Sequence, residues 1–192
     1  MSSPLQLTGD PEADELLGRE PLALLMGMLL DQQVPMEWAF RGPRTIKERL
    51  GGRLDAAEIA AMDPERLESV FRGPPAVHRF PGSMAKRAQA LCQTLVENYG
   101  GDAEAVWRDA KTGDELLARV KSLPGFGAEK SKIFCALLAK RFGIRPEGWE
   151  KATSPFSDNT ARSVADIDSP ETLAKVREWK KAMKARGKTK SD

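Results

Sequence analysis

The segment from Asp114 to Phe142 has the residue pattern of a backbone anion-binding site. Its sequence, DELLARVKSLPGFGAEKSKIFCALLAKRF, predicts a helix, a tight LPGFG turn at residues 123–127, and a second helix. Such a turn places consecutive backbone N–H groups at the positive end of the second helix, where an anion can bind. We expect Gly125 and Gly127 to adopt conformations that side chains resist, and to let a polyanion backbone approach closely.

Two lysines near the start of the second helix support this interpretation. Lys130 and Lys132 lie in its first turn, where a cation is unfavourable unless a phosphate offsets it. We therefore predict polyanion contacts from Gly125, Phe126, Gly127, Lys130, Ser131 and Lys132. The alternative is an ordinary helical hairpin in which the glycines only form a turn.

Helices are the elements expected to position these residues. Strand signals are nearly absent, and helical periodicity with start and stop residues recurs, so the chain is predicted to be all-α, a compact multi-helix bundle. Leu22–Leu30 is apolar on every face, as in a helix at the centre of a bundle. The expected helices are Asp10–Arg19, Pro21–Gln32, Pro35–Phe40, Gly42–Leu50, Asp55–Ala61, Asp63–Phe71, Gly82–Tyr99, Ala103–Ala110, Asp114–Ser122, Ala128–Phe142, Pro146–Thr153 and Ser169–Ala185.

Length and charge limit the organisation. With 192 residues, we expect one domain over residues 1–186, followed by a short basic tail at 187–192. The net charge is +2, but Ser169–Asp192 carries +5 and the rest carries −3. The bulk of the fold is therefore not broadly basic, and any polyanion contact must be local.

Cysteine usage and hydropathy exclude several classes of protein. Cys92 and Cys135 are solitary and lie among apolar residues, which predicts buried thiols, with no disulfide framework, zinc cluster or iron–sulfur cluster and no other cofactor. No apolar stretch reaches the roughly 18 residues that span a bilayer, and the N-terminus lacks signal-peptide features. We expect a cytoplasmic protein, associated with the nucleoid if the source is a prokaryote.

Two motifs together resemble a known family. The LPGFG turn with its following helix is similar to the hairpin of the DNA glycosylases of the helix-hairpin-helix/GPD superfamily, whose hairpin grips DNA phosphates without reading sequence. The segment Leu29-Leu30-Asp31-Gln32-Gln33 resembles the LSQQ-type segment of the same superfamily, in which a glutamine enters the space vacated by the target base. The resemblance covers roughly Pro21–Thr153 and implies a two-lobed helical fold without the iron–sulfur cluster.

A third segment, Ala76–Ala88, resembles the superfamily's GLYNSKA loop, which opens a helix beside the pocket. His78 is the single histidine of the chain, and an imidazole can change charge near neutral pH. It either donates to a flipped base or a phosphate, or is satisfied by backbone groups. Arg79, Lys86 and Arg87 either face the distorted DNA strand or are simply solvated.

The catalytic positions depart from the pattern of the superfamily. A lysine two residues after the second hairpin glycine gives many members lyase activity, but Glu129 stands at that position here. The resemblance therefore implies a monofunctional enzyme that cleaves the N-glycosidic bond with water.

Such hydrolysis passes through an oxocarbenium-like state that a carboxylate stabilises. The superfamily's aspartate in the loop after the second helix is absent, and the alignment places Glu150 there, with Glu147 and Asp158 nearby.

Asp31 is a candidate for this carboxylate by a separate argument. Next to glutamines that are expected to meet DNA, an acid repels phosphates, and at the C-terminal end of a helix it gains nothing from the dipole. It should therefore have a specific partner, namely a base edge, a water or an arginine. Most aromatic residues are expected in the core, with Trp149 as a residue that could stack on an extruded base.

The sequence thus predicts a monofunctional base-excision DNA glycosylase that acts as a monomer on duplex DNA containing a lesion or mismatch. A first alternative is a non-catalytic binder of abasic or distorted DNA that kept the hairpin and lost the carboxylate. A second is an α-helical interaction module whose hairpin is merely a turn.

Overall fold

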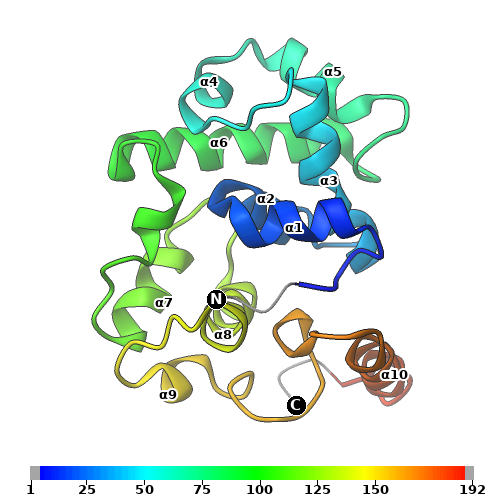
Figure 1. The fold of residues 1–192 in the computed structure, drawn as a ribbon, viewed down its shortest axis with the longest axis vertical. Helices are drawn as coiled ribbons and strands as arrows, with labels where there is room; N and C mark the ends of the chain where they lie inside the picture. The colour runs from blue at the N-terminus through cyan, green and yellow to red at the C-terminus, as the bar shows by residue number, and fades with distance from the viewer. Residues whose placement is uncertain (1–4, 189–192) are drawn as a thin grey trace. The chain divides into compact units, whose positions relative to one another are not determined.

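The computed structural model of the chain describes residues 5–188. Over this range it is helical throughout, without β-strands, which confirms the predicted all-α class (Figure 1). The elements in order are α1 Pro11–Arg19, α2 Pro21–Leu30, α3 Met36–Arg49, α4 Ala56–Ala61, α5 Pro64–Arg72, α6 Pro81–Tyr99, the 3-10 helix η1 Ala103–Val106, α7 Gly113–Lys121, α8 Ala128–Phe142, α9 Trp149–Thr153, the 3-10 helix η2 Val164–Asp166, and α10 Pro170–Ala185.

The chain divides into two compact units. Unit 1 holds the described residues of Met1–Leu7, Trp107–Ser122 and Phe126–Asp192, and therefore α7 to α10. Unit 2 holds Thr8–Val106 together with Leu123–Gly125, and therefore α1 to α6. No described helix is long and apolar enough to cross a membrane. Of the predicted basic tail, residues 189–192 lie outside the described range.

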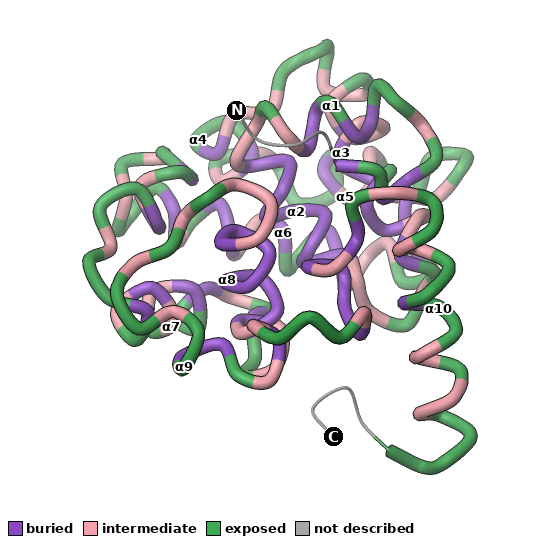
Figure 2. Tube along the Cα trace, turned by 60° about the horizontal axis from the view of Figure 1, so that its bottom comes forward, coloured by how far each residue is buried: buried purple, intermediate pink, exposed green. Residues whose placement is uncertain are grey.

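Helix α2 forms the centre of unit 2. Nine of its ten residues are buried, and α1, α3 and α6 pack around it (Figure 2). Burial of each large apolar side chain stabilises the fold by roughly 1.5–3 kcal/mol. Close approach to α3 needs two glycines, because a Cβ at Gly27 would lie 2.5 Å from the Phe40 ring and one at Gly42 would lie 2.6 Å from Leu30.

Helix α8 has the corresponding place in unit 1. Its residues from Ile133 to Ala139 are buried, and α7, α9 and η2 pack against it. The ring of Phe134 makes edge contacts with Trp107 and Phe126. Cys135 in α8 and Cys92 in α6 are free thiols, and burial raises the pKa of each to about 12.

Short polar side chains mark where many of the helices begin. Asp10, Asp55, Asp63, Thr112 and Ser169 each accept a hydrogen bond from a backbone N–H in the first turn of the helix that follows. Such caps satisfy N–H groups that have no partner within the helix. They explain why most predicted starts agree with the structure to within a residue.

Four predicted helices differ from the structure in extent by more than two residues. The two helices expected at 35–40 and 42–50 form the single helix α3, because packing on α2 carries it through Pro43 despite the lost hydrogen bond. The helix expected at 103–110 is only the four-residue η1. The helix expected at 146–153 begins at Trp149, because Gly148 has a left-handed φ of 77° and Glu147 bonds with its backbone to Lys111 and Gly113.

Asp10 connects two helices of unit 2 and makes a testable contribution to stability. Its carboxylate accepts from the N–H groups of Glu12 and Ala13 and pairs with Arg44 of α3. Burial acts to raise the pKa of Asp10, but the Arg44 guanidinium and the two N–H donors outweigh it and hold the pKa below 3.8.

We expect Asp10→Ala to lower the free energy of unfolding by about 1–2 kcal/mol, as measured by urea denaturation at pH 7. Because the folded pKa is depressed, the ionic part of this stability is present above about pH 4 and is lost as the pH falls through the folded pKa. Asp10→Asn keeps the cap and should lose only that pH-dependent part. An Asn variant as unstable as the Ala variant would contradict this division.

Candidate functional site

The end of α2 brings three predicted site residues to the surface of unit 2. The helix stops at Leu30, two residues earlier than predicted, and the N–H of Asp31 bonds to the carbonyls of Gly27 and Met28. Asp31 and Gln32 are half-buried, and Gln33 is exposed. Gln33 has a φ of 58°, which makes it the one non-glycine residue with positive φ in the described range. This left-handed conformation costs roughly 1–2 kcal/mol and is typical of functional turns.

Gln32 is held by partners from two other segments. Its side-chain amide nitrogen donates to the Leu29 carbonyl at 2.9 Å, and its side-chain oxygen accepts from the Arg87 guanidinium at 2.7 Å. Its backbone carbonyl lies 2.9 Å from Nε2 of His78. These bonds fix the turn against the loop before α6 and against α6 itself. Arg87 thus supports the turn, which sequence reasoning did not assign to it.

His78 is buried and acts within the protein. Its Nδ1 accepts from the Phe80 N–H at 3.0 Å, so Nε2 carries the proton and donates to the Gln32 carbonyl. Its ring is stacked with the ring of Trp38, with 6.5 Å between centroids, and is tilted against the ring of Phe80, with 6.1 Å between centroids. Of the two roles considered for His78, the structure favours satisfaction by backbone groups over direct donation to DNA.

Phe80 is an exposed aromatic residue beside this network. It is 43% exposed, contrary to the core position expected for most aromatics, and the exposed Arg79 lies over its ring at 5.6 Å. Its position in a loop between an arginine and a proline, outside any helical periodicity, is the signal that sequence reasoning missed. Arg79 and Phe80 thus expose a cation and a ring next to His78, which holds the Gln32 carbonyl, and such groups are suited to unstacked bases.

The hairpin turn uses its two glycines differently. Gly125 has a φ of 85°, and a Cβ there would lie 2.3 Å from Cδ1 of Leu29, so the turn packs against α2 two residues before Asp31. Gly127 is the N-cap of α8 with φ −77° and ψ −178°, a conformation open to any residue. The prediction that Gly127 needs a special conformation is therefore wrong. A Cβ at Gly127 would meet nothing within 4 Å, so the space that it leaves faces outward.

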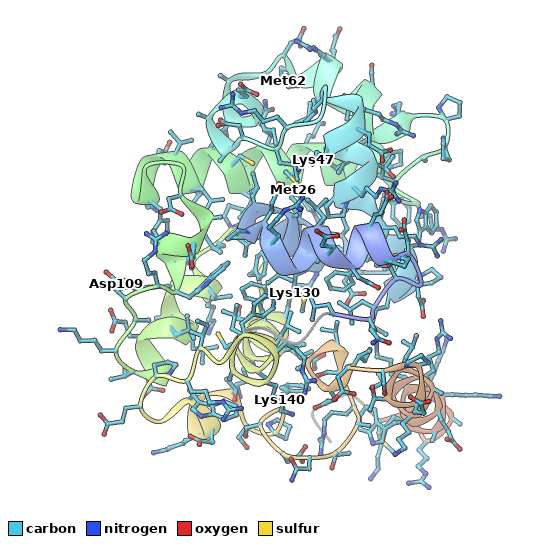
Figure 3. The ribbon with its side chains drawn as sticks, in the orientation of Figure 1. Met26, Lys47, Met62, Asp109, Lys130 and Lys140 are labelled. Atoms are coloured by element: carbon cyan, nitrogen blue, oxygen red, sulfur yellow. The ribbon has the colours of Figure 1, made fainter. Side chains whose placement is uncertain are left out.

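The side chains at the start of α8 divide between core and surface. Phe126 is 4% exposed and packs on Phe134, so only its backbone is available for the predicted phosphate contact. Ser131 is fully buried, and its hydroxyl has no hydrogen-bond partner among the described residues. Glu129 and Lys130 are half-buried, and Figure 3 labels Lys130 beside α8. Lys132 donates to the Ser154 carbonyl at 3.2 Å, just after α9.

The loop after α8 carries the remaining candidates. Glu147 and Glu150 are exposed, and Glu150 is the second residue of α9. Trp149 is half-buried, packs with its backbone against Gly113 at the start of α7, and has the Arg145 guanidinium 5.9 Å above its ring. Asp158 forms an ion pair with Arg162 at 2.7 Å, so its charge already has a partner.

Unit 2 therefore groups Asp31, Gln32, Gln33 and His78 around the end of α2, with Gly125 packed on the same helix. Unit 1 groups the start of α8 with α9, through the contact from Lys132. Among the described residues, no cluster of three or more histidine, cysteine or acidic residues could hold a metal ion.

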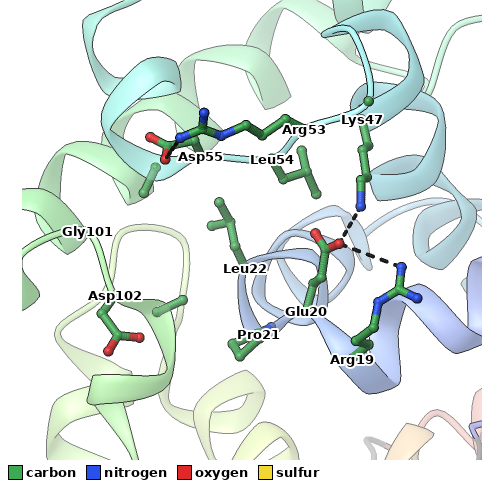
Figure 4. A pocket seen from close by; sticks show the side chains of 13 residues that line it. Arg19, Glu20, Pro21, Leu22, Lys47, Arg53, Leu54, Asp55, Gly101 and Asp102 are labelled. Atoms are coloured by element: carbon green, nitrogen blue, oxygen red, sulfur yellow. Dashed lines mark hydrogen bonds and ion pairs between the residues drawn. The ribbon is translucent and has the colours of Figure 1, made fainter.

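A pocket elsewhere in unit 2 is less suited to chemistry. It has a volume of about 380 Å³ and lies between the start of α2 and the loops before α4 and η1 (Figure 4). Five of its charged side chains are paired with one another: Arg53 with Asp55, and Glu20 with Lys47 and Arg19. A sixth, Asp102, accepts a hydrogen bond from the backbone N–H of Glu104.

Comparisons with known proteins identify the family of the chain. A family model described as HhH-GPD superfamily base excision DNA repair protein matches residues 26–189, which is most of the chain. No curated protein matches the chain. A solved structure titled as a trapped endonuclease III–DNA covalent intermediate, in an estranged-adenine complex, is similar at 20% identity and a TM-score of 0.47, covering 88% of this chain and 76% of that one.

The two glycines should respond differently to the same substitution. We expect Gly125→Ala to lower the free energy of unfolding by about 1–2 kcal/mol, because it forces a side chain into a left-handed conformation and displaces Leu29. Gly127→Ala should change it by less than about 0.5 kcal/mol. Urea denaturation of both variants tests this contrast, and equal losses would refute it.

Proposed function

Because this chain belongs to the HhH-GPD superfamily of base excision DNA repair proteins, we propose that it is a monofunctional DNA glycosylase. It hydrolyses the N-glycosidic bond of a damaged or mismatched base that has been extruded from duplex DNA, and leaves an abasic site. The observation that carries the monofunctional assignment is Glu129, a carboxylate at the position where the resemblance places the lyase lysine.

The hairpin is proposed to hold the DNA backbone. Gly127 leaves open space in front of the first turn of α8, where the N–H groups of a 15-residue helix point outward. A phosphate there gains from the helix dipole and from direct hydrogen bonds. Such contacts position the enzyme on any sequence and leave base selection to the groups around the pocket.

The turn at the end of α2 is proposed to meet the distorted base pair. Gln33 is exposed in a left-handed backbone conformation, and the bonds of Gln32 hold the turn, which limits the ordering needed when DNA binds. Phe80 can stack on an unpaired base, and Trp149 remains the proposed stacking partner of the extruded base. His78 acts as a positioning residue, because it ties the Gln32 carbonyl to the Phe80 N–H.

A carboxylate is proposed to stabilise the oxocarbenium-like state and to orient the attacking water. Asp31 directly precedes the two glutamines and lies at the surface end of a buried helix, which favours it. Glu150 is the second candidate, because it is exposed at the start of α9. Glu147 has its backbone committed to the bridge with α7, and Asp158 is paired with Arg162, which makes both weaker candidates.

A second candidate function is non-catalytic binding of abasic or distorted DNA. The lack of an aspartate in the loop after α8 favours it.

The two functions are separated by incubating the purified protein with duplexes that carry uracil, hypoxanthine, 8-oxoguanine, alkylated adenine or a mismatch. Release of a base, revealed by alkali, supports the glycosylase and identifies its substrate; tight binding of abasic duplex without any release supports the binder.

With the substrate found, borohydride should trap no covalent enzyme–DNA adduct, and strand breaks should appear only after alkali. The reason is that Glu129 cannot form the imine that a lysine amine would form. Denaturing gel electrophoresis measures both. Efficient trapping would show that another amine reaches the sugar and that the enzyme is bifunctional.

The catalytic carboxylate should separate chemistry from binding. We expect Asp31→Asn to lower the single-turnover rate of base release by at least about 100-fold, and to preserve or raise affinity for abasic duplex, because one repulsive charge near phosphate is gone. Glu150→Gln is the matched variant and should stay active. The reverse pattern would assign the role to Glu150, and wild-type rates in both would exclude both residues.

A further inference from the structure

Helix α10 carries a concentration of positive charge that the proposed site does not use. The described part of the chain from Ser169 onward contains seven lysines and arginines against two acids: Lys175, Arg177, Lys180, Lys181, Lys184, Arg186 and Lys188, with Glu171 and Glu178. The rest of the chain is slightly acidic overall. Because positive charge is concentrated in this helix, a contact with a polyanion here would be limited to the helix itself.

Three of these cations form a stripe, which we call the basic stripe: Arg177, Lys181 and Lys184. Their spacing of four and three residues puts them on one side of the helix. All three are exposed, whereas Val176 is buried and Trp179 is half-buried beneath the Arg162 guanidinium at 5.4 Å. Figure 2 shows most of α10 as exposed or intermediate. The helix is thus anchored by one side and presents the stripe on another.

The lysines of the basic stripe have no partner within the described residues. Neither Lys181 nor Lys184 makes a side-chain hydrogen bond or ion pair there, although Glu178 is only three residues from Lys181. Elsewhere, cations such as Arg44, Arg119 and Lys140 are paired with carboxylates. Like charges at this spacing cost a few tenths of a kcal/mol each, and only Lys184 lies close enough to the C-terminal end to gain from the dipole.

We propose that the basic stripe of α10 binds the phosphate backbone of duplex DNA as a second contact, separate from the hairpin. This inference rests on the proposed function. The stripe spans roughly 10 Å along the helix axis, over which a duplex presents about six charges. A lipid surface is a poorer partner, because the large exposed hydrophobic side chains of the described chain are Phe80 and Val96, and neither lies in α10.

The test is the salt dependence of binding to an undamaged duplex, with the full chain. We expect Lys181→Gln/Lys184→Gln to reduce the slope of log K against log salt by about 1.8, because each lost phosphate contact removes about 0.9. The loss of affinity should be the same on every sequence. An unchanged slope would overturn the proposal, as would a loss of binding to anionic lipid vesicles with duplex binding intact.

The matched control is Lys175→Gln/Arg186→Gln. These two exposed residues lie about 20° apart around α10, roughly 160° from the stripe lysines, and neither makes a side-chain interaction within the described residues. The control removes the same net charge and should leave the slope within about 0.5 of wild type. An equal reduction in the control would show that only net charge matters, which would also overturn the proposal.

One further measurement separates this inference from the proposed function. Gly127→Val should weaken binding to all duplexes through the hairpin, because the valine side chain occupies the open space in front of the first turn of α8. If wild-type protein binds no duplex, or Gly127→Val has no effect, the proposed function fails. If both hold and the stripe variant keeps its slope, only the second contact fails.

Discussion

The burial of α2 from Leu22 to Leu30 is the constraint on which the candidate site depends. This helix has no polar side chain to carry it to the surface, so it must be surrounded on all sides, and α3 comes close enough only because of Gly27 and Gly42. Its fixed position defines where the chain emerges at Asp31. The same helix receives the hairpin turn, through the contact between Leu29 and Gly125. One buried element thus sets the location of both the glutamine turn and the turn of the hairpin.

Polar groups at the end of α2 are organised by satisfaction of hydrogen bonds. A carbonyl that is withdrawn from water without a donor is costly, and the part-buried Gln32 carbonyl obtains its donor from His78. That imidazole in turn holds the Phe80 N–H, so the surface ring and the glutamine turn share one support. Gln33 can then remain in a strained conformation, because its neighbours are fixed. The network explains how a turn without regular structure is held in place, as the proposed contact with a base requires.

Many charged side chains of the fold are paired with a side chain of opposite charge. Carboxylates pair with guanidinium and ammonium groups across the helices, as Arg44 does with Asp10 and Lys140 with Asp166. Lys181 and Lys184 of α10 differ from this pattern, because neither forms an ion pair within the described residues. The second DNA contact that we propose uses these two lysines. A nearly neutral fold can in this way bind a polyanion through a few separate contacts.

The sequence by itself determined the helical class, most helix starts and the family, because capping residues, periodicity and the LPGFG motif act over a few neighbouring residues. It predicted α8 from Ala128 to Phe142 as the structure has it. Only the tertiary structure decided that α3 continues through Pro43, that Phe126 and Ser131 are buried, and that His78 serves the backbone. Those outcomes depend on which segments pack together over long sequence separations. The exposure of Phe80 and the bond from Arg87 to Gln32 were decided in the same way, by neighbours that no local pattern names.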